Sequence, residues 1–306
     1  MILLTKNVSI INAAKVVLVL IGAVFMLSSC KALGKDGLIL MTDDTYHATV
    51  YATNKAGFGA PDGLLWSNGK LYLADEGASS LEVWSEQDGL KKLMTSDFGT
   101  KSPEDLVMDA QGNIFFSDDD AGGIWEVDST GKQWRLNSQD HMLSSTEGIA
   151  LAPDGSLLVG NSDDHSIYKV TREGAVSLFL GKESGIIKPE SMTFDGQGNL
   201  YIADNEQNVL FMLDPDHQLH RVIDRQDHFS PETIFYSRGS LYITDSQSSK
   251  LYIYTPNNEL KAIATFGGKL KNIQGVTVDE RGDIYVSIQS DLKHNVGFIV
   301  KLSKES

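Results

Sequence analysis

The sequence is poor in positive charge and in the common signatures of catalysis. Its 26 Lys and Arg face 41 Asp and Glu, for a formal net charge of −15 over 306 residues. Phosphate backbones would repel such an acidic chain, so we expect no nucleic acid partner. The chain also lacks a Gly-x-Ser-x-Gly elbow, a His-Glu-x-x-His pair and a phosphate-binding loop, which removes several familiar kinds of active site. With 41% hydrophobic residues and 28 Gly, it can still bury a sizeable core.

Long hydrophobic runs and cysteine are equally scarce. Residues 16–26 form an apolar run of only 11 residues, whereas a transmembrane helix needs about 20. The run follows Lys6 and Lys15 and precedes Leu27-Ser28-Ser29-Cys30, which is the layout of a secretory signal peptide. Leu-Ser-Ser-Cys resembles a bacterial lipobox, in which the peptide is cut before the cysteine and the cysteine receives lipid. Lipidation would explain why an exported chain keeps a single, unpaired cysteine.

We therefore predict a lipoprotein signal peptide over residues 1–29 and a lipidated Cys30 with a tether over residues 30–44. Several acyl chains on one residue hold a protein stably at a membrane, so the membrane is an expected partner through the lipid on Cys30. Lys31, and not aspartate, follows the cysteine. By resemblance to enterobacterial sorting, this favours the outer membrane of the cell envelope, facing the periplasm or the exterior. An uncleaved membrane anchor is the alternative.

Internal repeats organise the remaining residues, 45–306. Six matching units begin near Pro61, Pro103, Thr146, Pro189, Pro231 and Ile273, at spacings of 42, 43, 43, 42 and 42 residues. Each unit reads as four short strands separated by Gly, Asn, Asp and Pro; in the fourth unit these are residues 191–194, 200–203, 209–213 and 219–223. A period of about 40 to 50 residues with four strands per unit is typical of propeller blades. We predict an all-β fold, a six-bladed β-propeller with four antiparallel strands per blade.

The two ends of this region complement each other. The sixth unit supplies only three strands, at residues 275–278, 284–286 and 297–302. Residues 45–53, ahead of the first unit, are rich in β-branched and aromatic residues and have no other sheet to join. We predict that this N-terminal strand closes the last blade, because the pairing covers two exposed edges.

Two segments of the fourth unit carry a family resemblance. Pro189-Glu190-Ser191-Met192-Thr193-Phe194-Asp195 and Gly198-Asn199-Leu200-Tyr201-Ile202-Ala203-Asp204 resemble NHL-type repeats. From about residue 45 to residue 302, the chain also resembles the gluconolactonase, senescence marker protein and luciferin-regenerating enzyme superfamily. That resemblance implies a six-bladed propeller with a divalent cation, usually calcium, in the channel, and hydrolysis of lactones or esters. NHL propellers are mostly binding platforms, so the resemblance leaves the activity open.

The repeat places two polar rings at one mouth of the central channel. The innermost strand of each blade starts at the second residue of its unit, and the antiparallel second strand ends beside it. The inner ring is Asp62, Glu104, Glu147, Glu190, Glu232 and Gln274. The outer ring is Asp75, Asp118, Asn161, Asp204 and Asp245. We expect the outer ring to accept hydrogen bonds from nearby backbone, which is the usual structural role of such residues.

The inner ring predicts a cation site. Carboxylates about 8 Å apart repel by about 2 kcal/mol per neighbouring pair at an effective dielectric constant near 20, and this raises their pKa unless a cation lies among them. Oxygen ligands favour calcium or magnesium over zinc. The candidate metal ligands are Asp62, Glu104, Glu147, Glu190 and Glu232, with calcium the expected cation. The ring departs from the gluconolactonase pattern because it contains no asparagine.

Hydrolysis would also need a general base. His141 and His228 lie in connections that lead into innermost strands, and His165 and His294 follow second strands. All four belong to the ringed face, and His141 and His228 are the candidate catalytic residues. For each, a solvated loop histidine is the alternative. Two functions stay open: a cation-dependent lactone or ester hydrolase acting on a small molecule, or a noncatalytic propeller that binds a peptide, a glycan or an envelope protein.

Overall fold

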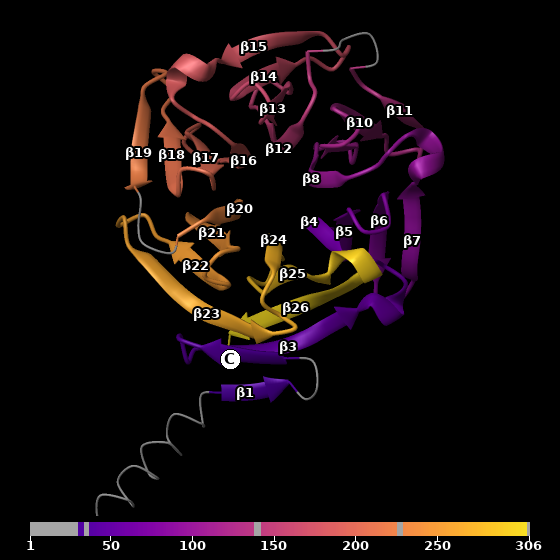
Figure 1. Cartoon of the computed structure of the whole chain (residues 1–306), viewed down its shortest axis with the longest axis vertical. Coiled ribbons are helices and arrows are strands. Elements are labelled where there is room, and N and C mark those ends of the chain that lie inside the picture. The colour runs from indigo at the N-terminus through magenta and orange to yellow at the C-terminus, as the bar shows by residue number, and fades with distance from the viewer. Residues whose placement is uncertain (1–29, 34–36, 138–141, 225–228, 305–306) are drawn as a thin grey trace, which may run out of the picture.

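Six small antiparallel sheets stand radially around a central axis in the computed structural model (Figure 1). The structure describes residues 30–33, 37–137, 142–224 and 229–304. Each blade uses four strands of the chain's repeat, so the predicted all-β, six-bladed propeller is confirmed. Within these described ranges, no helix is long and apolar enough to cross a membrane.

The first three blades each use four consecutive strands. Blade 1 is β4 (Pro61–Ser67), β5 (Lys70–Asp75), β6 (Ser80–Ser85) and β7 (Gly89–Met94). Blade 2 is β8 (Pro103–Met108), β9 (Ile114–Asp118), β10 (Gly123–Val127) and β11 (Gln133–Arg135). Blade 3 is β12 (Thr146–Leu151), β13 (Leu157–Asn161), β14 (Ser166–Val170) and β15 (Val176–Leu180).

The remaining blades follow the same plan. Blade 4 is β16 (Pro189–Phe194), β17 (Leu200–Asp204), β18 (Val209–Leu213) and β19 (Leu219–Asp224). Blade 5 is β20 (Pro231–Ser237), β21 (Ser240–Asp245), β22 (Lys250–Tyr254) and β23 (Leu260–Gly268). Blade 6 is β24 (Ile273–Val278), β25 (Ile284–Asp291), β26 (Val296–Lys304) and β3 (Tyr46–Thr53). Single turns of 3-10 helix lie in the connections, as η1 (Asn54–Ala56), η2 (Ser96–Phe98), η3 (Lys182–Ser184) and η4 (Leu292–His294).

The N-terminal strand closes the ring as predicted. β3 pairs antiparallel with β26, in a register that runs from Thr53 opposite Phe298 to Tyr46 opposite Lys304. Strands from the two ends of the propeller region therefore share one sheet.

Part of the stretch expected as a tether is also folded. β1 (Cys30–Leu33) and β2 (Gly37–Met41) extend blade 5 beyond β23, giving the strand order β1-β2-β23-β22-β21-β20. Residues 37–41 are Gly-Leu-Ile-Leu-Met, and Ile39 is fully buried in the core shared by blades 5 and 6. This apolar sequence favours a strand that covers the edge of β23 over a solvated linker.

Hydrophobic clusters between blades hold the ring together. Successive strand residues point to opposite faces of a blade, and β9 shows the result. Phe115 packs in the cluster shared with blade 3, whereas Phe116 packs in the cluster shared with blade 1, and both are fully buried. Because both faces of a blade are buried, the strands read as nearly continuous apolar runs.

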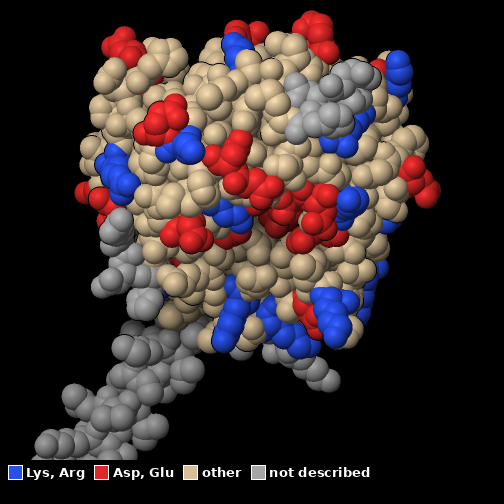
Figure 2. All heavy atoms as spheres, turned by 45° about the horizontal axis from the view of Figure 1, so that its top comes forward, with Lys and Arg blue, Asp and Glu red and all other residues tan. Residues whose placement is uncertain are grey.

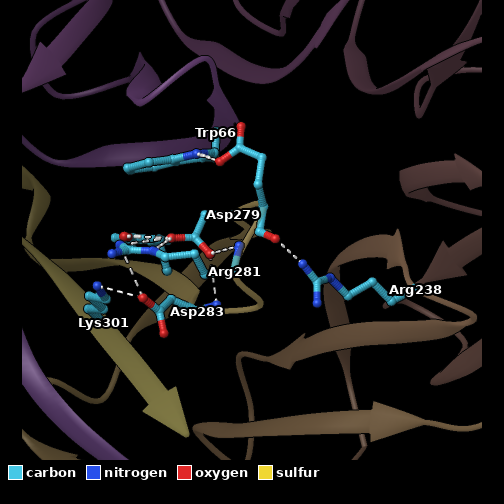
Figure 3. Close-up of polar contacts among 8 residues, drawn as sticks. Trp66, Arg238, Asp279, Arg281, Asp283 and Lys301 are labelled. Carbon is cyan, nitrogen blue, oxygen red and sulfur yellow. Dashed lines mark hydrogen bonds and ion pairs between the residues drawn. The ribbon is translucent and has the colours of Figure 1, made fainter. Parts of the chain in front are cut away.

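Polar contacts on the face opposite the predicted mouth also tie blade 6 to its neighbours (Figure 3). The Trp66 indole of blade 1 donates to Glu280 at 2.8 Å, and the Arg238 guanidinium of blade 5 donates to the Glu280 carbonyl. Within blade 6, Arg281 pairs with Asp279 at 3.2 Å and Lys301 pairs with Asp283 at 2.7 Å. The turn at residues 279–283 thus links three blades where the chain closes on itself.

A β-bulge sits at the start of every innermost strand. In blades 1, 2, 3, 5 and 6 the pairing of the first two strands skips from the first residue of the unit to the fourth, and in blade 4 from the first to the third. Bulges redirect side chains and are common beside functional sites. The bulged positions include every member of the inner ring.

Candidate functional site

The outer ring is structural, as the sequence predicted. Both oxygens of Asp75 accept backbone hydrogen bonds, from the amides of Gly59 at 2.5 Å and Ala60 at 3.0 Å. The other members likewise accept bonds from backbone amides: Asp118 from Lys101 and Ser102, Asn161 from Ser144 and Ser145, Asp204 from Ile187, and Asp245 from Ser248. All five side chains are fully buried. Each fixes a loop at its blade, so the ring orients the loops of the mouth.

The inner ring lies where the repeat placed it, at the starts of β4, β8, β12, β16, β20 and β24. Its six side chains are buried or half-buried. The structure divides the ring into two parts with different electrostatics. One part is neutralised from within the protein, and the other is not.

On the side of blades 3 and 4, a lysine bridges two ring carboxylates. Lys188 Nζ lies 3.2 Å from Glu147 Oε1 and 2.8 Å from Glu190 Oε2. Burial disfavours the charged lysine, but the carboxylates of Glu190 and Glu147 outweigh this effect and raise its pKa. Burial also raises the pKa of Glu147 and Glu190, although Lys188 opposes the shift. The sequence analysis missed Lys188, whose signal is its place directly before the fourth repeat.

On the opposite side, four carboxyl groups gather without a cation. Asp62 and Glu104 share a hydrogen bond, and Ser102 Oγ lies 3.1 Å from both Glu104 and Glu76. Glu232 is the fourth, with Asn205 Nδ2 at 3.4 Å. Within the described residues, none of the four forms an ion pair.

These four carboxyl groups also perturb one another. The pKa of Asp62 is raised well above its ordinary value by burial, then by Glu232 and Glu76. That of Glu104 is raised by burial, then by Asp62 and Glu76. Glu76 belongs to the site although the sequence analysis did not select it; it directly follows the outer-ring residue Asp75.

Two glutamines contributed by blade 6 complete this side of the mouth. Gln289 Nε2 donates to Glu76 Oε2 at 2.7 Å and lies 3.3 Å from Asp62 Oδ2. Gln274 Nε2 donates to Gln289 Oε1 at 3.2 Å. Gln289 was also missed, because it lies beyond the outer-ring position of β25, where Ile288 interrupts the polar series. The amides give the mouth hydrogen-bond donors without giving it positive charge.

The side chains as arranged do not fit the expected calcium site. A bound cation needs several oxygen ligands converging on one point, yet Lys188 already pairs with two ring carboxylates, and Asp62 bonds to Glu104. In the part of the chain that the structure describes, no three acidic or histidine side chains are grouped closely enough to hold a metal ion. The five ring acids therefore share a mouth without forming one coordination sphere.

The candidate catalytic histidines, His141 and His228, lie outside the described residues. Of the other two histidines assigned to this face, His165 Nδ1 lies 2.8 Å from the carbonyl of Ile187, and His294 Nδ1 lies 2.7 Å from Asp291 Oδ2. Both contacts are exposed. These two histidines are thus loop residues with local partners.

Solved structures of similar shape include both enzymes and a binding protein. A catalytically inactive virginiamycin B lyase from Staphylococcus aureus, with quinupristin, is 16% identical (TM-score 0.65; 85% of this chain and 100% of that chain covered). A gluconolactonase from Xanthomonas campestris is 15% identical (TM-score 0.63; 91% and 92% covered). An auxiliary nutrient binding protein from Bacteroides ovatus is 12% identical (TM-score 0.66; 86% and 77% covered). At these identities, the likenesses show the fold alone.

Sequence comparison identifies the family. No curated protein sequence matches the chain. A family model described as an SMP-30/gluconolactonase/LRE-like region matches residues 105–296, which is most of the propeller and includes four of the five acidic residues of the inner ring. The sequence pattern, the six blades and this match agree: the chain belongs to the SMP-30/gluconolactonase/LRE-like family.

Proposed function

We propose that this protein is a noncatalytic propeller whose acidic mouth binds basic side chains of a peptide or an envelope protein. The observation that carries the proposal is Lys188, whose ammonium group lies between Glu147 and Glu190. It shows how the ring accommodates one lysine. The carboxyl groups of Asp62, Glu76, Glu104 and Glu232 offer the same chemistry to a cation from outside.

The energetics favour a cationic ligand on that side. Burial and mutual repulsion raise the pKa of Asp62 and Glu104, so the charged form of this cluster is costly without a counter-charge. An incoming ammonium or guanidinium group supplies that charge and donates hydrogen bonds to oxygen atoms that already face the mouth. The acidic surface supports the approach of a basic ligand, because Asp and Glu side chains gather across the middle of the face seen in Figure 2.

The proposal predicts opposite effects of two substitutions. We expect Glu232→Gln to weaken binding of a fluorescently labelled lysine-rich peptide about 10-fold, because a hydrogen bond to a charged group is lost. Lys188→Met should strengthen binding, since it frees Glu147 and Glu190 for the ligand. Fluorescence anisotropy with the purified protein measures both, and a peptide with glutamine at every lysine position is the reference ligand.

Asp216→Asn is the matched control, because it removes the same charge from an exposed turn on the opposite face, between β18 and β19. It should leave peptide affinity unchanged at physiological salt, where exposed charges more than about 8 Å apart are screened. Equal binding of the lysine and glutamine peptides would contradict the proposal. So would identical affinities of wild type, Glu232→Gln and Lys188→Met.

Hydrolysis of a lactone or ester is the second candidate, favoured by the Asp62–Glu104 pair. Hydrogen-bonded carboxyl groups with raised pKa values can divide into a proton donor and a proton acceptor. Calcium is the cation, and His141 and His228 the bases, that this candidate would use. Calorimetric calcium titration of wild type and of a Glu147→Gln, Glu190→Gln double variant, with gluconolactone hydrolysis measured in parallel, decides the matter. No binding heat in either protein and no hydrolysis would eliminate the hydrolase candidate.

We also propose that lipid on Cys30 anchors the propeller to the bacterial envelope, at the outer membrane. The lipobox-like Leu27-Ser28-Ser29-Cys30 supports this proposal. The placement of Cys30 at the start of β1, paired with β2 on the edge of blade 5, supports it further. The anchor would then join the propeller at its rim and leave the channel mouth free.

A further inference from the structure

The central channel contains an apolar cavity of about 220 Å³, separate from the carboxylates of the mouth. All six innermost strands line it, mainly with Leu, Ile, Val, Met and Phe. It extends to Met108, Leu151 and Phe194, which are the last residues of β8, β12 and β16. The acidic ring occupies the other ends of these strands, so the cavity extends toward the opposite face of the propeller.

Asp105 is the one ionisable side chain that lines this cavity. The matching positions in the other blades are small residues: Gly63, Gly148, Ser191, Thr233 and Gly275. Three of them are tightly confined, since a Cβ at Gly63 would lie 2.3 Å from the Glu104 carbonyl oxygen, and Gly148 and Gly275 are similarly crowded. Neighbouring blades therefore meet closely at this level, and Asp105 projects its carboxyl group into the space that remains.

The Asp105 carboxyl group has unused capacity as an acceptor. Oδ1 accepts from its neighbour's amide, Leu106 N, at 2.8 Å. Oδ2 has only two long contacts, with Ile149 N and Ser191 Oγ, both at 3.4 Å. A carboxylate offers about four lone-pair sites, and no Lys, Arg or His of the described residues forms an ion pair with Asp105. An acid buried in this way is costly until a donor joins it.

We propose that the channel cavity binds a small primary amine with an apolar body, whose ammonium group pairs with Asp105. The ammonium group brings three donors to the free lone pairs of the carboxylate, and the body displaces water from the aliphatic and aromatic walls. The size is suitable, because an engineered apolar cavity of about 150 Å³ holds benzene. An apolar pocket with a few convergent polar groups is the usual form of a small-molecule site.

Benzylamine is a suitable probe and benzyl alcohol its uncharged counterpart. In calorimetric titrations of the purified protein, we expect benzylamine to bind wild type and to lose about 10- to 100-fold in affinity on Asp105→Asn, because one charged hydrogen-bonding partner is neutralised. Benzyl alcohol should bind both proteins equally. Asp105→Leu, an apolar replacement, should likewise abolish the preference for the amine and retain the alcohol.

The location can be read without any variant. Carbon-13 labelling of methionine methyl groups should show that benzylamine shifts the signals of Met108 and Met192, which line the cavity. The signal of Met94, buried in the core between blades 1 and 2, should stay in place and serves as the internal control.

Three outcomes would overturn this inference: no benzylamine binding to wild type, shifts absent at Met108 and Met192, or equal benzylamine affinity in wild type and Asp105→Asn. Glu232→Gln separates it from the proposed function of the mouth, because this variant should leave benzylamine affinity unchanged. Loss of benzylamine binding on Glu232→Gln with retention on Asp105→Asn would place the amine at the mouth. That result would contradict the channel site and support the mouth.

Discussion

Glu82 illustrates at the residue scale how the propeller tolerates buried acid. It lies fully buried in β6, where Ser80 Oγ donates to it at 2.9 Å and Lys92 Nζ lies 3.3 Å away. Burial, followed by the nearby Asp75, raises its pKa to about 7 from an ordinary value of 4.5. The half-exposed Lys92 offsets only part of this effect.

This shift predicts a pH-dependent stability. The folded protein keeps the Glu82 proton up to about pH 7, whereas the unfolded chain releases it near 4.5, so its contribution to stability is lost as pH rises through that interval. Glu82→Gln should therefore gain about 2 kcal/mol relative to wild type between pH 4 and pH 8. Urea unfolding at both values measures the change, with the exposed Glu86→Gln as control. Parallel pH profiles for wild type and Glu82→Gln would show that the burial argument is wrong.

The inner ring shows which residue-level features were predictable. Asp62, Glu104, Glu147, Glu190 and Glu232 repeat at a fixed position, so the sequence could assign them to one mouth. Lys188, Glu76 and Gln289 lie in the mouth as well, but none repeats from blade to blade. Their partners come from neighbouring blades, and that proximity has no signature within one repeat. The expectation of one metal coordination sphere rested on the ring acids alone, and these three residues alter its chemistry.

At the scale of elements, the closing strand has the largest structural consequence. β3 covers the edge of β26 and buries Tyr46, Ala48 and Ala52. Its prediction depended only on counting strands, since the sixth unit lacked one and the N-terminus had one to spare. β2 was harder to foresee, because a fifth strand on blade 5 breaks the four-strand pattern of the repeat.

Two truncations separate these strands. Removing residues 1–44 deletes β1 and β2 but keeps β3, and should leave a cooperative unfolding transition. Removing residues 1–53 also deletes β3, and should lower the free energy of unfolding by more than about 3 kcal/mol, because several buried side chains are lost at roughly 1.5–3 kcal/mol for each large one. The uncovered β26 edge should also promote aggregation. Urea unfolding followed by circular dichroism, with size-exclusion chromatography, measures both effects; equal stability of the two truncations would contradict the closing role of β3.

At the scale of the whole molecule, the expected anchor and the candidate sites occupy different places. β1 lies at the outer rim of the ring, whereas the mouth and the channel cavity lie on its axis (Figure 1). A lipid on Cys30 would thus hold the propeller by its circumference. Ligands could reach the mouth without passing the membrane surface.

Anchoring predicts a membrane-bound protein that depends on one side chain. Wild type should fractionate with membranes and carry acyl chains on an N-terminal Cys30, because each buried methylene adds about 0.8 kcal/mol to membrane affinity. Cys30→Ser should lack the acyl mass. Mass spectrometry of the N-terminal peptide after membrane fractionation tests both, with Ser28→Ala as the control. An unmodified Cys30 in wild type would refute the anchor.

The sequence by itself determined the number of blades, the position of nearly every strand, the closure by β3 and the ring of acids at one mouth. All of these follow from a period of 42 or 43 residues and from local strand and turn preferences. The tertiary structure decided which carboxylate meets a lysine, which meets another carboxylate, and that Asp105 faces an apolar cavity. Those outcomes depend on how closely adjacent blades approach and where their bulges aim each side chain, and such distances are set only when all six blades have packed.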